Sequence, residues 1–106
     1  MGWVDSAIQS HQDVLRLDPK DANSHYNLAV LYNQKGLIDK AVNSFLEVIQ
    51  ITPDDSEAHY RLGLIYLQKS LLDKAIIEFQ EALRIKPDYR EALQQLERLN
   101  LLKRLQ

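Results

Sequence analysis

The chain has 106 residues, with 13 Lys and Arg against 15 Asp and Glu, a formal net charge of -2 and no cysteine. Interspersed charges disfavour nucleic-acid binding, which needs a concentrated basic face, and the lack of cysteine excludes disulfides and thiolate metal sites but fits reducing and oxidising compartments alike. The longest apolar run, 62–67, is too short to cross a bilayer, and no secretory leader opens the chain. We therefore expect one soluble domain without membrane insertion, in the cytoplasm by default.

A fixed interval of 34 residues runs through the chain. It separates three prolines, Pro19, Pro53 and Pro87. An alanine precedes each proline at a constant distance, at Ala7, Ala41 and Ala75. Self-similarity at such a period indicates stacked supersecondary units.

Apolar residues spaced three and four apart, as in Ala41, Phe45 and Val48, predict amphipathic helices with one buried stripe. We place helices near 3–17, 22–35, 39–51, 56–69, 73–85 and 90–104. Prolines follow the ends of three of them, because the residue before a proline is disfavoured in helical geometry. Asp39 and Asp73 stand where N-caps are expected.

The turns at 36 and 70 occupy the same position in successive repeats. Gly36 suits a left-handed C-terminal cap, whereas Ser70 would pay roughly 1 kcal/mol for that conformation. We therefore expect a looser turn at Ser70.

A set of small, aromatic and proline residues recurs in register: Leu28-Ala29, Tyr32, Gly36, Ala41, Phe45 and Pro53, then Leu62-Gly63, Tyr66, Ala75, Phe79, Ala82 and Pro87. This pattern resembles the tetratricopeptide repeat family and covers nearly the whole chain. The resemblance implies an all-α, right-handed superhelical array in which each repeat is a helix-turn-helix unit with a first (A-type) and a second (B-type) helix. The six helices would follow the order B-A-B-A-B-A in a single array: 1–21 a half repeat, 22–55 and 56–89 full repeats, and 90–106 a C-terminal capping helix.

The two ends of this array differ. The first helix is B-type and lacks an A-type partner, so Trp3 and Val4 are expected on an apolar surface and the N-terminal end to be cut from a longer array. On the last helix, Glu97 replaces the small residue found at Ala29 and Gly63, which indicates a polar cap.

In the family, one face of the A-type helices lines a concave groove. The resemblance therefore implies a protein-interaction module that binds a partner peptide or helix there. Tyr26 and Tyr60 would be amphipathic anchors, while Asn27 could bond a peptide backbone and Arg61 a ligand carboxylate. The expected groove residues are Asn23, Tyr26, Asn27, Val30, Asn33, Glu57, Tyr60, Arg61, Leu64, Gln68, Gln95 and Arg98. The opposing interpretation is that Tyr26 and Tyr60 merely cover adjacent helices.

Two subclasses of the family match only in part. One clamps a C-terminal carboxylate with lysine, asparagine and arginine; Asn27 and Arg61 match two positions, but Glu57 stands where a lysine is wanted. The other carries an asparagine ladder along the groove, which Asn27 fits and Arg61 and Gln95 break.

No catalytic constellation is found, so we expect no enzyme and no cofactor. His11, His25 and His59 fall at packing positions, which favours structural histidines over a metal site. The alternative function is self-association as a structural scaffold, with homo-oligomers formed through the exposed N-terminal helix and the C-terminal leucines. These are Leu101, Leu102 and Leu105.

Overall fold

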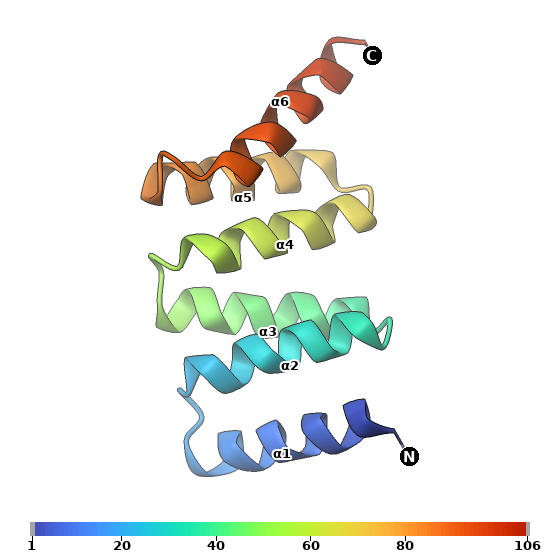
Figure 1. Cartoon of the computed structure of the whole chain (residues 1–106), viewed down its shortest axis with the longest axis vertical. Helices are drawn as coiled ribbons and strands as arrows, with labels where there is room; N and C mark the ends of the chain where they lie inside the picture. Colours follow the sequence, from blue (N-terminus) through green and yellow to red (C-terminus); the bar gives the residue numbers. More distant parts are fainter. Residues whose placement is uncertain (1, 106) are drawn as a thin grey trace. The chain divides into compact units, whose positions relative to one another are not determined.

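The computed structural model describes residues 2–105 and shows six α-helices and no strand in this range (Figure 1). The helices are α1 Trp3–Leu17, α2 Ala22–Gln34, α3 Ile38–Ile51, α4 Ser56–Gln68, α5 Leu72–Ile85 and α6 Arg90–Arg104. Each bound lies within one residue of the sequence-based prediction. The chain is an all-α helical repeat array, as expected.

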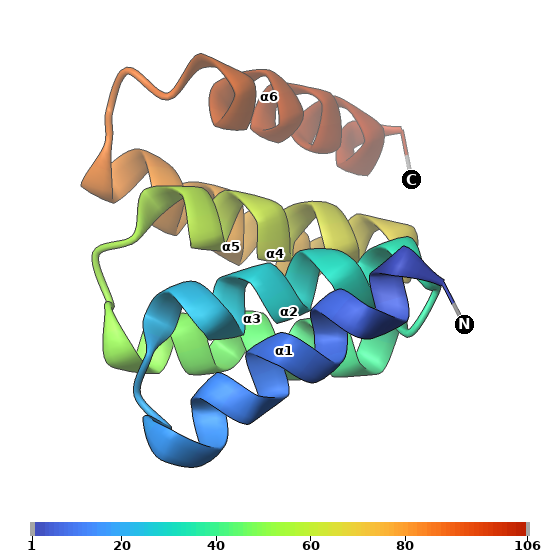
Figure 2. The same ribbon diagram turned by 60° about the horizontal axis from the view of Figure 1, so that its bottom comes forward.

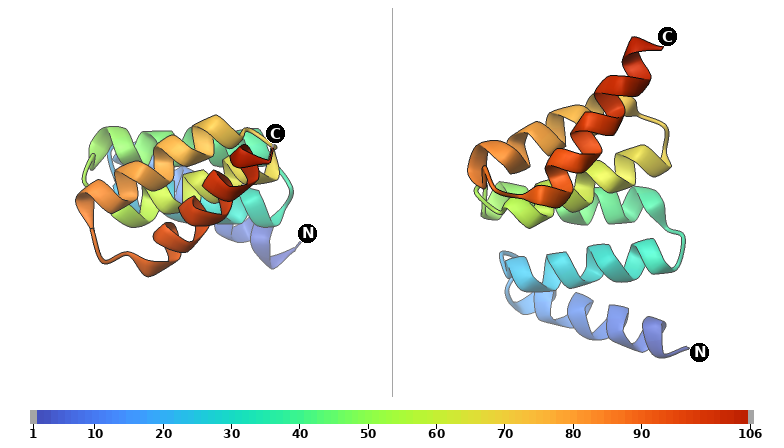
Figure 3. Two further views of the ribbon diagram at one scale, coloured as in Figure 1. Left: turned by 90° about the horizontal axis from the view of Figure 1, so that it is seen from above. Right: turned by 45° about the horizontal axis from the view of Figure 1, so that its top comes forward.

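The chain divides into two compact units, Met1–Pro53 and Asp54–Gln106. In the first unit, α2 and α3 form an antiparallel hairpin and α1 packs on α2 (Figure 2). In the second unit, α4 and α5 form the corresponding hairpin and α6 packs on α5 (Figure 3). Thus each unit contains one helix pair with the 34-residue period and one further helix.

The core of each unit is built from the residues that recur in register. Phe45 and Val48 of α3 are fully buried, as are Phe79 of α5 and Leu62 of α4. A Cβ placed on Gly63 would lie 2.7 Å from the ring of Phe79, so the large B-type side chain requires a minimal A-type residue opposite it. This contact explains why small residues recur at that position.

The two hairpin turns have the same geometry, so the prediction of a looser turn at Ser70 was wrong. Gly36 has φ 80° and Ser70 has φ 60°, both left-handed. The amide of Leu37 donates to the Tyr32 carbonyl at 2.8 Å, and the amide of Leu71 donates to the Tyr66 carbonyl at 2.9 Å. The bonds that close a Schellman-type cap thus hold Ser70 in a conformation that serine disfavours.

The N-cap predictions for Asp39 and Asp73 were also wrong. Leu37 and Leu71 are the N-caps of α3 and α5, and the two aspartates lie in the first helical turn. The helices begin earlier because the same leucine that closes the turn accepts, through its carbonyl, the first helical bond from Ala41 or Ala75. In the first turn, an aspartate still interacts favourably with the helix dipole.

Side-chain caps are found instead at the starts of α2 and α4. Asp21 accepts a hydrogen bond from the Ser24 amide at 3.2 Å, and Asp55 accepts one from the Ala58 amide at 3.0 Å. These bonds satisfy amides that a helix N-terminus leaves without intrahelical partners.

An ion pair ties an A-type helix to the preceding B-type helix in each unit. Lys35 pairs with Asp5 in the first unit, and Lys103 pairs with Asp73 in the second. The hydrogen bond and charge of Lys35 lower the pKa of Asp5 below its ordinary value. Both partners of each pair are partly exposed, so these pairs add little stability.

Apolar side chains are exposed on the first and last helices. Trp3 of α1 is 78% exposed, as its unpaired position predicts, whereas Val4 is half-buried. On α6, Leu101, Leu102 and Leu105 are exposed. Within residues 2–105, no helix combines the length and apolar character needed to span a membrane.

Candidate functional site

The expected binding face of the first unit lies on α2. Leu28, Ala29 and Tyr32 are buried, which confirms that this side of α2 packs inside the array. On the other side, Asn23 and Asn27 are exposed, and Tyr26, Val30 and Asn33 are half-buried. The helix therefore presents polar side chains beside partly covered apolar ones.

Tyr26 contributes to packing as well as to this face. Its ring meets Phe45 of α3 edge-on, with centroids 5.6 Å apart and planes at 82°. Aromatic pairs of this geometry stabilise a fold beyond the area they bury. Tyr26 is thus a rigid element of the surface.

Asn33 is distinguished by a buried side-chain oxygen. Its Oδ1 has no hydrogen-bond partner in the structure. The same position of α4 is occupied by Leu67, so the polar group is peculiar to the first unit. A buried acceptor without a hydrogen-bond partner is uncommon in folded proteins.

The corresponding face of the second unit lies on α4. Glu57 and Arg61 are exposed on successive turns, and Arg61 Nε lies 3.6 Å from Glu57 Oε2. Leu64 is half-buried and Gln68 is exposed. From α6, Gln95 is half-buried and Arg98 is exposed.

An aromatic cluster supports this face. Tyr60 lies 5.7 Å from Phe79 and 5.0 Å from Tyr89, measured between ring centroids. The ammonium of Lys86 stands 5.0 Å above the Tyr89 ring. Tyr89, the N-cap of α6, was not singled out from the sequence because it lies outside the recurring pattern.

Burial raises the pKa of Tyr89 to about 12, and the negative charge of Glu57 adds to this rise. Arg61 opposes it in part. The phenol therefore stays protonated at neutral pH and can donate a hydrogen bond at the edge of the face.

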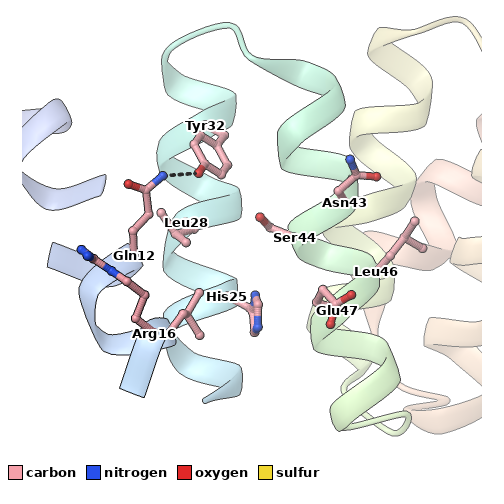
Figure 4. A pocket seen from close by; sticks show the side chains of 10 residues that line it. Gln12, Arg16, His25, Leu28, Tyr32, Asn43, Ser44, Leu46 and Glu47 are labelled. Atoms are coloured by element: carbon pink, nitrogen blue, oxygen red, sulfur yellow. Dashed lines mark hydrogen bonds between the residues drawn. The ribbon is translucent and has the colours of Figure 1, made fainter. Parts of the chain in front are cut away.

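A separate hollow opens in the first unit between α1 and α3, over α2 (Figure 4). It has a volume of about 510 Å³, and Gln12 and Tyr32 are joined across its upper end by a hydrogen bond of 3.0 Å. Its lining combines apolar surface from Leu15, Leu28 and Leu46 with polar side chains: Gln12 and Arg16 from α1, His25 from α2, and Asn43, Ser44 and Glu47 from α3. This hollow was not predicted from the sequence.

The histidines lie apart in distinct environments. His59 is buried and bonded to Glu78, His25 is bonded to the Pro19 carbonyl, and His11 is half-buried. Across residues 2–105, no group of three or more His, Cys, Asp or Glu side chains is arranged to hold a metal ion.

Solved structures similar to this chain are helical repeat proteins. MamA is 27% identical and superposes with a TM-score of 0.91 over 98% of this chain and 61% of that one. The chain thus spans about three-fifths of the length of MamA. YrrB, described as a TPR protein with an unusual peptide-binding site, is 24% identical, with a TM-score of 0.82 over 89% of this chain and 48% of that one.

A third neighbour is the first TPR of Spaghetti bound to the HSP90 peptide SRMEEVD. It is 19% identical and has a TM-score of 0.86 over 93% of this chain and 79% of that one. At this identity, and at that of YrrB, the likeness shows the fold alone. No curated protein sequence matches the chain.

Family models match most of the sequence. The model described as TPR repeat matches residues 1–36 and 31–70, and the model described as Tetratricopeptide repeat matches residues 56–89. These matches, together with the helix pairs and their 34-residue period, show that the chain belongs to the tetratricopeptide repeat family.

Proposed function

We propose that this chain is a protein-interaction module that binds peptide segments on the exposed faces of its A-type helices. The observation that carries the proposal is the pairing, in both units, of an exposed hydrogen-bonding side chain with a half-buried tyrosine: Asn27 beside Tyr26, and Arg61 beside Tyr60. The aromatic contacts hold both tyrosines in place before a ligand arrives, so little side-chain entropy is lost on binding.

Peptide binding by neighbours of the same fold supports this function. Spaghetti was solved with a bound peptide, and YrrB is described by its peptide-binding site. Members of the family act as scaffolds, and a non-enzymatic role follows for this chain as part of the proposal.

The ligand we propose is an internal peptide segment rather than a free C-terminus. Glu57 already lies beside Arg61, at 3.6 Å, and its negative charge would repel a terminal carboxylate. The exposed amides of Asn27 and Asn23 suit a peptide backbone, which offers both donors and acceptors.

The test is selection of binding peptides from a random display library, followed by measurement of Kd. We expect Kd values of about 1 μM, or -8 kcal/mol. The double variant Asn27→Ala, Arg61→Ala should bind at least about tenfold more weakly, a loss of roughly 1.4 kcal/mol.

The matched control is Asn100→Ala, Arg104→Ala, which removes the same side-chain types from exposed positions of α6. Equal affinities for the two double variants would refute binding at these faces. Blocking the peptide C-terminus as an amide should leave Kd unchanged, and a marked loss would instead indicate a carboxylate clamp.

Self-association is the second candidate. Apolar side chains are exposed at both ends of the array: Trp3 at the start of α1, and Leu101, Leu102 and Leu105 near the end of α6. In a complete repeat, Gly63 of the A-type helix lies opposite Phe79 of the B-type helix. On α6, the position of Gly63 is occupied by Glu97. The B-type position of Phe79 is His11 on α1. Joining α6 of one copy to α1 of another would therefore set a carboxylate against an imidazole.

Sedimentation equilibrium tests this candidate directly. Self-association predicts a mass that rises with protein concentration and falls back to the monomer in the Glu97→Lys variant. A monomer at the highest concentration reached would reject it.

A further inference from the structure

The two units differ at one position opposite a shared histidine. His25 and His59 are one repeat apart, and so are Ser44 and Glu78 on the B-type helices that face them. In the second unit the histidine is bonded to a carboxylate, and in the first unit a short hydroxyl side chain takes the position of that carboxylate. The hollow between α1 and α3 lies beside this serine.

The second unit shows what fills the space when the carboxylate is present. His59 Nδ1 lies 2.8 Å from Glu78 Oε1, and the two side chains are only 8% and 17% exposed. Because an ionised carboxylate only accepts, Nδ1 carries the proton of this bond. A histidine on the A-type helix and a glutamate on the B-type helix thus form a buried hydrogen-bonded pair.

The first unit has the histidine without the glutamate. Ser44 is buried at the base of the hollow, while Gln12, Arg16 and Asn43 along its sides are exposed. Figure 4 shows His25 standing between Arg16 of α1 and Glu47 of α3. Among residues 2–105, the His25 ring has one hydrogen-bond partner, the Pro19 carbonyl, 2.9 Å from Nε2.

We infer that this hollow binds the carboxylate of an acidic side chain from a protein partner, in the place that Glu78 takes in the second unit. The Ser44 hydroxyl and the Gln12 amide are available donors, His25 Nδ1 becomes a donor when the ring is protonated, and Arg16 supplies positive charge. Leu15 and Leu46 line the same hollow, so they can contact the partner chain that carries the acidic residue. None of the residues that line the hollow belongs to the peptide-binding faces proposed above.

The hydrogen bond of His25 links this binding to protonation. The Pro19 carbonyl can only accept, so Nε2 keeps its proton and Nδ1 of the neutral ring has none. A carboxylate can bond to Nδ1 only after the ring gains a second proton. Affinity therefore rises as the pH falls, by up to about tenfold per pH unit for one coupled proton.

Two charged side chains, Arg16 and Glu47, line the hollow beside His25. Arg16 attracts an anion but is paired with Asp13 on its own helix. Glu47 of α3 repels one, and with Lys20 it also lines a neighbouring hollow. Removal of the Glu47 charge should therefore strengthen binding.

The experiment is an NMR titration of the full chain, following the His25 ring signals at pH 6 and pH 8. The probes are free glutarate, the blocked peptide acetyl-Ala-Ala-Glu-Ala-Ala-amide, and the same peptide with glutamine. We expect the glutamate peptide to bind more tightly than glutarate, at least tenfold more tightly at pH 6 than at pH 8, and the glutamine peptide not to shift His25. Binding of glutarate alone would overturn the assignment to a protein partner, and binding of neither would overturn the site.

Two substitutions of Ser44 distinguish the effect of a carboxylate charge in the hollow from the effect of filling its volume. Ser44→Glu should recreate the His59–Glu78 pair, raise the protonated fraction of His25 at pH 7 and abolish peptide binding. Ser44→Gln fills the same volume without charge and should leave the protonated fraction unchanged. Glu47→Gln should tighten peptide binding several-fold.

Equal protonation of His25 in the glutamate and glutamine variants would contradict the proposed geometry. Thermal unfolding of each variant checks its fold. If Ser44→Glu does not fold, Glu47→Gln decides, because unchanged affinity in that variant would contradict an anion in the hollow.

Discussion

Tyr89 carries a pH dependence that belongs to a single residue. Its phenol has a pKa of about 12 in the folded chain because of burial, against an ordinary value of 10.0. The stabilising contribution is complete below pH 10, where both states are protonated, and is lost as the pH rises from 10 to 12, because the unfolded chain ionises first. Burial also raises the pKa of Tyr66, so this residue adds to the same loss of stability.

The variant Tyr89→Phe should therefore lose less stability in alkali than the wild type, by about 1 kcal/mol once solvent screening is allowed for. Urea unfolding at pH 9 and pH 11.5 measures this difference. Tyr66→Phe is the matched comparison, because it removes the second phenol whose pKa is raised by burial. Parallel losses in Tyr89→Phe and the wild type would show that the Tyr89 phenol does not resist ionisation.

At the residue scale, the sequence predicts packing better than it predicts partners. Ala29, Phe45 and Phe79 are buried as their periodic positions indicate. The His59–Glu78 bond and the role of Tyr89 could not be foreseen, because each depends on how two helices are placed. A comparison of Ser44 with Glu78 across one repeat was available and would have pointed to the hollow.

At the element scale, the turn at Ser70 holds a serine in a strained backbone conformation. A φ of 60° is unfavourable for serine because its Cβ crowds the backbone, whereas glycine has no Cβ. Ser70→Gly should stabilise the chain by about 0.5–1 kcal/mol, since part of the gain is offset by the greater freedom of glycine in the unfolded state. Chemical unfolding of the two chains measures the difference.

Gly36→Ser is the reverse change in the other turn. A Cβ on Gly36 would meet no atom within 4 Å, so any loss of stability there is purely conformational. We expect a loss of similar size. If Ser70→Gly is neutral while Gly36→Ser destabilises, the surroundings of Ser70 must compensate for its conformation.

Helices could be placed from sequence because three independent features agree: apolar spacing, the prolines that follow them, and the recurring glycine or serine turn. The N-caps were misplaced because a cap depends on backbone geometry one or two residues away. Leu37 takes the cap position through the turn that precedes it. The true side-chain caps, Asp21 and Asp55, stand just before the A-type helices.

At the scale of the whole molecule, the repeat period predicts the order of elements and the family. It does not predict where the chain divides into compact units, because every repeat boundary has the same sequence pattern. Nor does it identify the ligand: the proposed binding faces of α2 and α4 differ at most of their exposed positions, as in Asn27 and Arg61. Function in such an array lies in the side chains that vary between repeats.

The six helices should open with different free energies. In α1 only Ile8 is buried, and in α6 only Ala92 and Leu99, whereas α2 and α4 have five and six buried residues. Local opening costs least where few apolar contacts are lost. Amides of α1 and α6 should therefore exchange at least about tenfold faster than those of α2 and α4, a difference of about 1.4 kcal/mol.

Native-state hydrogen exchange resolved by NMR measures this order directly. The ion pairs Lys35–Asp5 and Lys103–Asp73 join α1 to α2 and α6 to α5, but both are partly exposed and should add little protection. The Asp5→Asn variant tests that point, because exchange in α1 should accelerate by less than about fivefold. Uniform protection across all six helices would mean that the chain opens only as a single cooperative unit, which contradicts the nearest-neighbour behaviour expected of a repeat array.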